Sequence, residues 1–320
     1  MKNDKTVAFK STIFVIMVQF QLPSPLEQLS SDLLSQHGIK VYVKRDDLIH
    51  PIISGNKWRK LKYNIKAAKD NGFNQLLTFG GAFSNHIIAT ATAAKAHGLK
   101  SVGVIRGEEP KNWSTTLENC KAAGMQLKFI SRTAYRSKED PAFIKDLVDE
   151  LGESYVIPEG GANQFGRKGC EEIISEIMLP FDYLCCSAGT GTTAAGILSR
   201  IEKEKLLVFP ALKGGGFLKD EILSNPSLSK KGESIQLFEN YHFGGYAKIN
   251  EALIDFTKEF YSTYQLKLDL VYTAKLFYGV FDLINQGYFN RGSKLVLLHS
   301  GGLQGNMGFE NRYDVQLFGS

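Results

Sequence analysis

The chain has 320 residues, of which 43% are hydrophobic and 22% are charged, as expected of a globular protein with one or two domains and a substantial core. Its formal net charge of +5 is spread along the chain, which argues against the concentrated basic surface of a nucleic-acid-binding protein. Four cysteines without C-x-x-C spacing predict reduced thiols in a cytoplasmic protein rather than a disulfide framework or a metal site.

The first notable segment is the apolar run STIFVIMVQF at 11–20, which follows a charged start and imitates the core of a signal peptide. The run is about half as long as a membrane span requires. No small-residue cleavage site separates it from QLPSPLEQL, as a signal peptide would need. We therefore expect a buried first strand or other initial segment here, with a signal peptide as the lesser alternative, and no membrane association.

Strand-like and helix-like segments then alternate along most of the chain. The expected strands are 41–44, 75–79, 101–105, 126–130, 183–186, 206–210 and 294–299, and the expected helices are 58–71, 84–97, 112–123, 165–178, 191–203, 248–263 and 273–287. Gly72, Gly98 and Gly124 are predicted to end three of the helices. Apolar strands separated by helices predict an α/β fold with parallel strands buried on both faces. Ligands of such folds bind outside the carboxyl ends of the strands.

The lysine-rich segment SGNKWRKLKYNIKAAKDNG, 54–72, places Lys57 at a helix start with Arg59 and Lys60 close behind it. Nearby cations and a helix N-terminus lower the pKa of an amine and make it a better nucleophile. Lys62 and Lys66, like Lys69, are expected to belong to the solvated face of the helix.

Three glycine-rich loops follow predicted strands. TFGGAFSNHIIAT, 78–90, offers N-cap residues and free N–H groups suited to a carboxylate. CCSAGTGTTAAGIL, 185–198, can bind phosphate at a helix N-terminus, although a tight turn without a ligand explains it equally well and it lacks the Gly-Lys-Ser/Thr of a nucleotide P-loop. The third loop is LLHSGGLQG, 297–305. A phosphate loop, a carboxylate loop and a helix-start lysine are together the parts of a pyridoxal phosphate site.

These motifs also carry a family resemblance. GNKWRKLKYN, GGAFSNH, EGGANQFGRKG, SAGTGTTAAG, HFGGYAK, VYTAKLFYG and LHSGG resemble the 1-aminocyclopropane-1-carboxylate deaminase / D-cysteine desulfhydrase family, pyridoxal phosphate enzymes of fold type II in the tryptophan synthase β-like group. The resemblance runs from about Val41 to Gly302. It implies two open, twisted, mostly parallel sheets flanked by helices, a larger domain of 1–65 and 170–320, a smaller domain of 66–169, and a homodimer.

The resemblance also implies residue roles. Lys57 matches the lysine that forms an imine with pyridoxal 5'-phosphate, Ser84 faces the substrate carboxylate, and Asn85 hydrogen-bonds the ring hydroxyl of the cofactor. Tyr246 and Tyr272 match two active-site tyrosines, although each would otherwise be taken for a packed aromatic. The other expected cofactor contacts are Asn56, Ala188, Gly189, Thr190, Gly191, Thr192, Thr193, Thr273 and Ser300.

Two of these positions bear on the reaction. Ring-opening deaminases of the family resemble VYEGK and HLGG, whereas this chain has Thr273 and Ser300 at the corresponding places. A carboxylate near the ring nitrogen would favour its protonated form and a stronger electron sink, so neutral hydroxyls favour β-elimination, with D-cysteine as the expected substrate. Ser300 in place of the usual threonine, and NYHFGGYAK in place of a Gly-Pro-x-Tyr stretch, leave the substrate open.

Two alternative functions are also compatible with the sequence. A ring-opening deaminase is the second enzymatic possibility, and a non-catalytic pyridoxal phosphate-binding homologue is the third, although the retained Lys57 argues against it. His299, at a predicted strand end, is expected to be a packed or hydrogen-bonded histidine. The absence of a G-x-S-x-G motif argues against a serine hydrolase.

Overall fold

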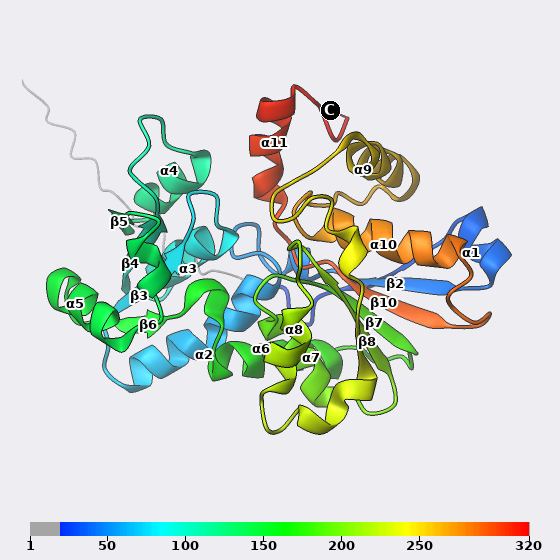
Figure 1. The fold of residues 1–320 in the computed structure, drawn as a ribbon, viewed down its shortest axis with the longest axis horizontal. Coiled ribbons are helices and arrows are strands. Elements are labelled where there is room, and N and C mark those ends of the chain that lie inside the picture. Colours follow the sequence, from blue (N-terminus) through cyan, green and yellow to red (C-terminus); the bar gives the residue numbers. More distant parts are fainter. Residues whose placement is uncertain (1–19, 320) are drawn as a thin grey trace, which may run out of the picture.

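The computed structural model describes residues 20–319. The initial strand expected within 11–20 lies outside the described residues, except for Phe20, whose ring stacks on Trp58 with the centroids 3.6 Å apart. Across the described part of the chain, no helix combines the length and the apolar character needed to span a bilayer. Figure 1 shows two lobes, each built on its own sheet, with helix α2 (Asn56–Asp70) running between them.

The larger sheet has the strand order β1-β2-β10-β7-β8-β9, and every neighbouring pair is parallel except β1 with β2. Residues of β10 alternate between the two faces: Leu295 and Leu297 join the core under α1, α9 and α10, while Val296 and Leu298 join the core above α6, α7 and α8. The sheet is therefore buried on both faces, as its apolar strands predict. The strands are β1 (Leu26–Leu29), β2 (Lys40–Lys44), β7 (Tyr183–Ala188), β8 (Lys205–Pro210), β9 (Ile235–Leu237) and β10 (Lys294–Leu298), and the helices are α1 (Asp32–His37), α6 (Gln164–Ser175), α7 (Thr192–Arg200), α8 (Phe217–Leu223), α9 (Glu251–Tyr264), α10 (Thr273–Asn285) and α11 (Asn306–Tyr313).

The smaller sheet has the order β5-β4-β3-β6 and is parallel throughout. Neighbouring residues of β3 again face opposite layers, since Leu76 packs with residues of α2 and α3 while Leu77 packs with Leu147 of α5. Its strands are β3 (Gln75–Gly80), β4 (Lys100–Arg106), β5 (Gln126–Ile130) and β6 (Tyr155–Ile157), and its other helices are α3 (Asn85–Ala96), α4 (Thr115–Ala122) and α5 (Pro141–Leu151).

The two lobes are joined by α2 and α6, which pack along each other. Their backbones approach closely at Gly169, where a Cβ atom would lie 1.8 Å from the carbonyl oxygen of Arg59. Only glycine fits such a contact. We propose that the domains divide at 65/66 and 169/170, positions that fall inside these two helices.

The expected α/β fold with two mostly parallel sheets is confirmed, and each expected strand and helix within the described residues is present with its ends shifted by a few residues. The three glycines expected to end helices have φ values of 79°, 70° and 89° at Gly72, Gly98 and Gly124, the left-handed region that favours glycine after a helix. The sequence analysis did not identify β1, β6 and β9, which have only three or four residues, nor α1, α5, α8 and α11. Of these, α5 carries a readable signal, since Asp140 caps it and Pro141 is its first residue.

Candidate active site

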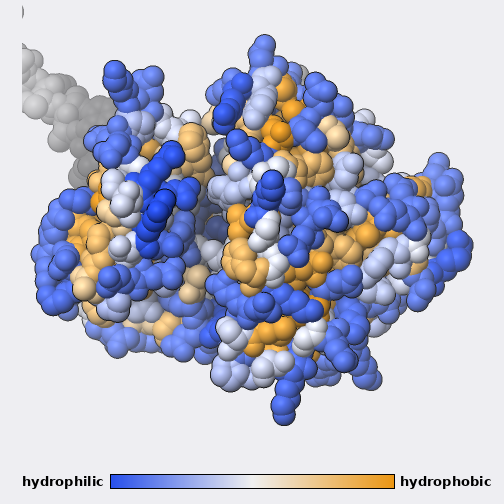
Figure 2. Space-filling view, viewed as in Figure 1, coloured by the Kyte–Doolittle hydropathy of each residue, from blue (hydrophilic) through white to orange (hydrophobic). Residues whose placement is uncertain are grey.

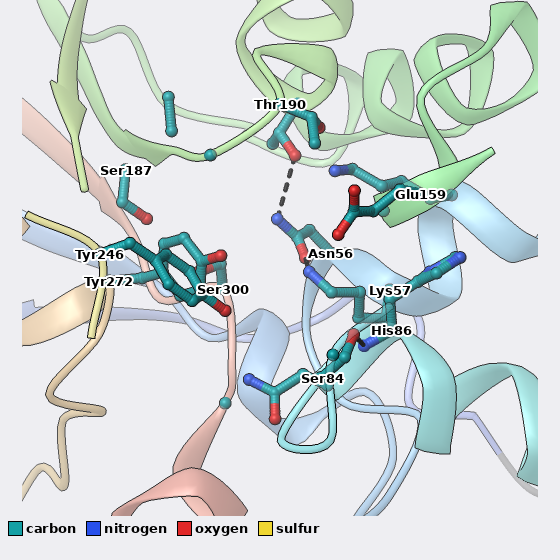
Figure 3. Close-up of a pocket in the computed structure, with 18 of the residues that line it drawn as sticks. Asn56, Lys57, Ser84, His86, Glu159, Ser187, Thr190, Tyr246, Tyr272 and Ser300 are labelled. Atoms are coloured by element: carbon teal, nitrogen blue, oxygen red, sulfur yellow. Dashed lines mark hydrogen bonds between the residues drawn. The ribbon is translucent and has the colours of Figure 1, made fainter. Parts of the chain in front are cut away.

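The site is a cavity of about 520 Å³ between the two lobes. Figure 2 shows the molecular surface hollowed at this place. The lining comes from loops at the carboxyl ends of strands in both sheets and from the start of α2, the position expected for ligands of open α/β folds. Figure 3 shows Lys57 and Asn56 on one side of the cavity, Tyr246 and Tyr272 opposite, and Thr190 and Ser84 at two further edges.

Lys57 is held in this cavity by a close contact between two loops. Gly55, the N-cap of α2, has a φ of 65°, and a Cβ atom there would lie 1.7 Å from the carbonyl oxygen of Ser300. The amine of Lys57 donates to Oδ1 of Asn56 at 2.9 Å, and Nδ2 of Asn56 donates to the hydroxyl of Thr193 at 3.0 Å. Asn56 therefore links the amine of Lys57 to Thr193, which follows β7.

The environment of Lys57 favours its neutral form. Burial, and after it the charge of Lys60, lowers the pKa of the Lys57 amine to about 7, despite opposing contributions from Cys170 and Asp269. A substantial fraction of the amine is therefore unprotonated at neutral pH, which is the state that acts as a nucleophile or a base.

This pKa shift predicts an unusual reactivity. In protein stripped of cofactor, we expect acylation of Lys57 by an amine-reactive reagent to rise with pH around a midpoint near 7, because only the neutral amine reacts. Labelling at a series of pH values, read by peptide mass spectrometry, measures this midpoint. Lys66, whose side chain is 67% exposed, is the internal reference. A midpoint for Lys57 above pH 9 would contradict the prediction.

The turn from Ala188 to Thr193 offers donors to an anion. Within the described residues, the N–H groups of Gly189, Thr190 and Gly191 make no hydrogen bond, and α7 begins without a side-chain cap. A helix N-terminus with free N–H groups attracts phosphate. Thr190 and Thr192 share a hydrogen bond of 2.9 Å between their hydroxyls. The cavity is lined by the expected residues Ala188, Gly189, Thr190, Gly191 and Thr193, whereas Thr192 is not among its lining.

Lys60 is a second buried amine in the cavity, 4% exposed. Its side chain lies beside Gly161, and the preceding Gly160 lies beside Thr190, so this lysine lines the same side of the cavity as the turn. Its amine takes part in none of the ion pairs among residues 20–319, and burial lowers its pKa. The sequence analysis treated Lys60 only as a neighbour of Lys57; its position one helical turn after Asn56 was the signal that it faces the cavity.

The loop after β3 brings Ser84, Asn85 and His86 to the cavity. The Ser84 oxygen caps α3 by accepting the N–H groups of His86 and Ile87, and its own proton remains available to a ligand. The hydroxyl of Thr78 donates to the carbonyl of Ile157 and so accepts from Nε2 of His86 at 2.9 Å. Nδ1 of His86 is then an acceptor, and it is buried with no partner among residues 20–319. Burial, together with Lys57 and Lys60, lowers the pKa of His86 well below its ordinary value, so the ring is neutral.

The tyrosine pair lies across the cavity from Lys57, with the rings of Tyr246 and Tyr272 6.1 Å apart and 67° from coplanar. Burial, and next the neighbouring Tyr246, raises the pKa of Tyr272 well above its ordinary value, so its phenol stays neutral and can donate a proton. Tyr246 is 47% exposed and stands at the mouth.

Tyr272 is positioned by Asp269, a residue that the sequence analysis did not identify. Asp269 is 1% exposed and accepts the N–H groups of Val271, Tyr272 and Thr273. The hydroxyl of Thr273 contacts the same carboxylate at 3.0 Å and does not line the cavity. The expectation that Thr273 contacts the cofactor is therefore not supported by its position, whereas Ser300 does line the cavity. His299 is fully buried, with its ring nitrogens bonded to the carbonyl of Lys267 and the N–H of Gly301, as expected of a packed histidine.

Lys275 positions the other tyrosine. Its amine donates to the carbonyls of His242 and Gly245, the residue before Tyr246, at 2.9 and 2.8 Å. Burial lowers the pKa of Lys275 to about 8. We expect Lys275→Met to destabilise the protein by about 1–3 kcal/mol, because the buried carbonyl of Gly245 loses its donor and the part-buried carbonyl of His242 loses one of two, and to raise hydrogen exchange in 242–247. Urea unfolding and exchange mass spectrometry measure both effects. Lys258→Met, on the exposed side of α9, is the control, and equal results for the two variants would contradict the prediction.

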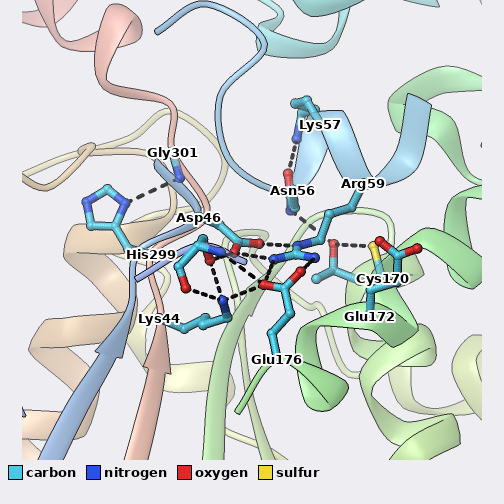
Figure 4. A network of polar contacts seen from close by, with 12 residues as sticks. Lys44, Asp46, Asn56, Lys57, Arg59, Cys170, Glu172, Glu176, His299 and Gly301 are labelled. Atoms are coloured by element: carbon cyan, nitrogen blue, oxygen red, sulfur yellow. Dashed lines mark hydrogen bonds and ion pairs between the residues drawn. The ribbon is translucent and has the colours of Figure 1, made fainter. Parts of the chain in front are cut away.

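A buried ion network lies behind Lys57 (Figure 4). The Arg59 guanidinium bonds both oxygens of Asp46 and both oxygens of Glu176, at 2.6 to 2.9 Å. Lys44 donates to Glu176 at 2.6 Å and contacts the hydroxyl of Ser24. Burial alone would raise the pKa of Glu176, but the hydrogen bonds and charges of Arg59 and Lys44 lower it to about 2. The network ties the start of α2 to β2 and to the end of α6.

The polar groups of the cavity fit pyridoxal phosphate. A phosphate would accept hydrogen bonds from the free N–H groups of the 188–193 turn and from the amine of Lys60. An aldehyde would react with the partly neutral amine of Lys57. A ring hydroxyl could hydrogen-bond to the buried acceptor Nδ1 of His86 or to the amide of Asn85. Such a combination of an amine, an anion site and ring partners is what this cofactor requires.

Comparisons with known proteins agree with this geometry. A model of the family described as pyridoxal-phosphate dependent enzyme matches residues 18–301. A Pyrococcus horikoshii protein provisionally named a 1-aminocyclopropane-1-carboxylate deaminase is 31% identical over an alignment of 323 residues, gaps included. The alignment covers 94% of this chain and 97% of that protein. The Arabidopsis thaliana mitochondrial bifunctional D-cysteine desulfhydrase/1-aminocyclopropane-1-carboxylate deaminase is 30% identical over 312 residues, 89% of this chain and 77% of that protein. A crystal structure of an ACC deaminase homologue has a TM-score of 0.79 at 28% identity, covering 92% of this chain and 94% of the other.

Proposed function

Because this chain belongs to the pyridoxal-phosphate dependent enzymes, we propose that it catalyses β-elimination from a small D-amino acid in the manner of a D-cysteine desulfhydrase. With D-cysteine the products are pyruvate, ammonia and sulfide. The single observation that carries the proposal is the buried, partly neutral amine of Lys57 beside an uncapped helix N-terminus in a cavity between two lobes. The names of the relatives include both 1-aminocyclopropane-1-carboxylate deaminase and D-cysteine desulfhydrase, so they support the proposal at the level of these two reactions.

We assign the cofactor contacts as follows. Lys57 binds its aldehyde carbon, Lys60 and the turn from Ala188 to Thr193 hold its phosphate, and Asn85 contacts its ring. When bound, pyridoxal phosphate supplies an electron sink for the negative charge that develops at the substrate Cα. Asn56 keeps the lysine amine in place through its 2.9 Å hydrogen bond, and it links that amine to Thr193 of the phosphate turn.

The remaining residues act on the substrate. Lys57, once free, removes the proton from Cα, a role that requires the neutral amine. The hydroxyl of Ser84 donates to the α-carboxylate, since its oxygen is already occupied by the N–H groups of α3. Tyr272 stays neutral and offers its proton to the departing group, with Tyr246 closing the mouth.

The choice of β-elimination over ring opening rests on the wall that carries Ser300 and the tyrosines. Among the described lining residues the one carboxylate is Glu159, which belongs to the smaller lobe. The carboxylate behind the wall, Asp269, is occupied by the N–H groups of Val271, Tyr272 and Thr273, and a wall lined by hydroxyls leaves a weaker electron sink than a lining carboxylate would. Elimination tolerates this because a good leaving group departs as soon as the Cα proton is removed.

Product analysis tests the proposal. Purified enzyme with pyridoxal phosphate is given D-cysteine, L-cysteine and 1-aminocyclopropane-1-carboxylate in parallel, and sulfide, pyruvate and 2-oxobutyrate are measured. Sulfide with pyruvate from D-cysteine, and little from the L-isomer, is the expected result. Release of 2-oxobutyrate as the dominant activity would establish the ring-opening deaminase that the relatives' names also allow. We also propose that the protein is cytoplasmic and forms a homodimer. The mass of the protein in solution tests the homodimer.

A further inference from the structure

The smaller lobe contributes a group of charged residues to the cavity that the reaction above does not use. Arg106 ends β4, Arg132 follows β5, and Glu159 follows β6, and all three line the cavity. In a parallel sheet these carboxyl ends lie at one edge. The neighbouring β3 supplies the loop with Ser84 at the same edge. The four strands of the smaller sheet therefore present the substrate carboxylate loop and a charged wall side by side.

Arg106 is held by an aromatic ring rather than by an acid. Its guanidinium carbon lies 5.8 Å from the ring centroid of Tyr135, and its Nη2 lies 3.7 Å from the place of a Cβ on Gly81, in the carboxylate loop. Among residues 20–319, neither Arg106 nor Arg132 forms an ion pair. A cation–π contact fixes the guanidinium while leaving its N–H donors free.

Tyr135 is the buried aromatic residue behind Arg106. Its side chain is 4% exposed, and its hydroxyl lies close to the carboxylate of Glu159. Burial, followed by the charge of Glu159, raises the pKa of this phenol, with Arg106 acting in the opposite direction, so the hydroxyl stays protonated. Glu159 and Arg106 line the cavity, whereas Tyr135 is not among the lining residues and lies behind Arg106, which it contacts through its ring.

The charge of this wall is positive overall. Among the described lining residues, Glu159 is the one carboxylate of this wall, so the two arginines exceed it in charge. We propose that Arg106, with Arg132, forms a subsite for a second anionic group on the substrate side chain. The preferred substrates are then small D-amino acids whose side chain ends in a carboxylate, sulfonate or phosphate ester. This inference rests on the proposed function, because it describes the side-chain end of the same substrate.

Ligands paired as charged and neutral test the subsite. Binding of D-aspartate and D-asparagine is measured on the holoenzyme by titration calorimetry, and O-phospho-D-serine and D-serine, which the enzyme can consume by elimination, are compared as competitors of sulfide release from D-cysteine. We expect each charged ligand to bind about tenfold or more tightly than its neutral partner, since charge-assisted hydrogen bonds to arginine are strong and specific. The two pairs separate carboxylate from phosphate recognition. D-2,4-Diaminobutyrate is added as a cationic ligand.

Arg106→Gln should remove this preference, whereas Arg136→Gln, the same change at an exposed arginine outside the cavity lining, should keep it. Equal binding within both pairs would overturn the proposal. Tighter binding of diaminobutyrate than of D-aspartate would also overturn it, because Glu159 would then be the residue that binds the substrate side chain. A variant that weakens charged and neutral ligands equally would place Arg106 at the α-carboxylate and also overturn it. Sulfide release from D-cysteine is measured on the same preparations, so a failed subsite and a failed function give different results.

Discussion

Lys57→Ala is expected to lower turnover by about 10³-fold or more, because loss of a general base alone typically costs about 10²–10⁴-fold and this residue also holds the cofactor. The variant should lose the absorbance band of the lysine-linked cofactor as well. Absorbance spectra of the purified protein and sulfide release from D-cysteine measure the two effects. The cavity position and the pKa near 7 of this amine are what distinguish it from the other lysines of the segment.

Two variants make the result specific to one amine. Lys66→Ala removes an exposed lysine of the same helix, 2.8 Å from Asp70, and should leave the spectrum and the rate unchanged. Lys60→Ala should keep the covalent link but weaken cofactor affinity, because a phosphate contact is lost. If borohydride reduction followed by peptide mass spectrometry found the cofactor on Lys60 instead, the assignment of Lys57 would be wrong.

The sequence predicted those parts of the site that lie within a single loop. Ser84, Asn85 and the 188–193 turn follow a local pattern of a strand, glycines and a helix start, Lys57 follows a glycine at a helix start, and the structure brings them to one cavity. Local pattern is informative there because helix caps and strand ends are determined by neighbouring residues. The fold class followed for the same reason, from apolar strands alternating with helices.

Residues that act through distant partners could not be predicted in this way. Asp269 reads as an ordinary acidic residue until its carboxylate is seen capping α10. Arg106 and Glu159 line the same cavity although they follow from different strands and are more than 50 residues apart in sequence. Thr273 shows the opposite case: the family resemblance implied a cofactor contact, whereas in the structure its hydroxyl contacts Asp269 and it does not line the cavity. Whether a side chain in the first turn of a helix points toward a ligand depends on how the helix packs. The sequence of that segment alone does not determine it.

The network behind Lys57 predicts the largest effect on stability. Arg59 is 1% exposed and bonds two carboxylates that lie 13 and 117 residues away in sequence. We expect Arg59→Met to lower the free energy of unfolding by about 3–5 kcal/mol, because it leaves Asp46, which is fully buried, as an uncompensated charge. Urea unfolding of both proteins at neutral pH measures the difference.

Matched controls and pH identify the ion pairs as the cause. Arg200→Met breaks an exposed pair with Glu171, where the arginine side chain is 62% exposed, and should cost less than about 1 kcal/mol. The pKa of Glu176 is about 2 in the folded protein against 4.5 for an ordinary glutamate. Its stabilising contribution is therefore complete above about pH 4.5 and is lost as pH falls toward 2.

Removing Arg59 leaves Lys44 as the remaining cation beside Glu176, so the folded pKa of this carboxyl should rise toward 4.5. The acid-dependent loss of stability then shrinks in Arg59→Met, because protonating Glu176 no longer sacrifices the bonds to the guanidinium. Unfolding measured between pH 5 and pH 2.5 should show a shallower slope for this variant than for the wild type or Arg200→Met. Parallel curves for all three proteins would show that Arg59 stabilises the start of α2 by packing and not through its charge.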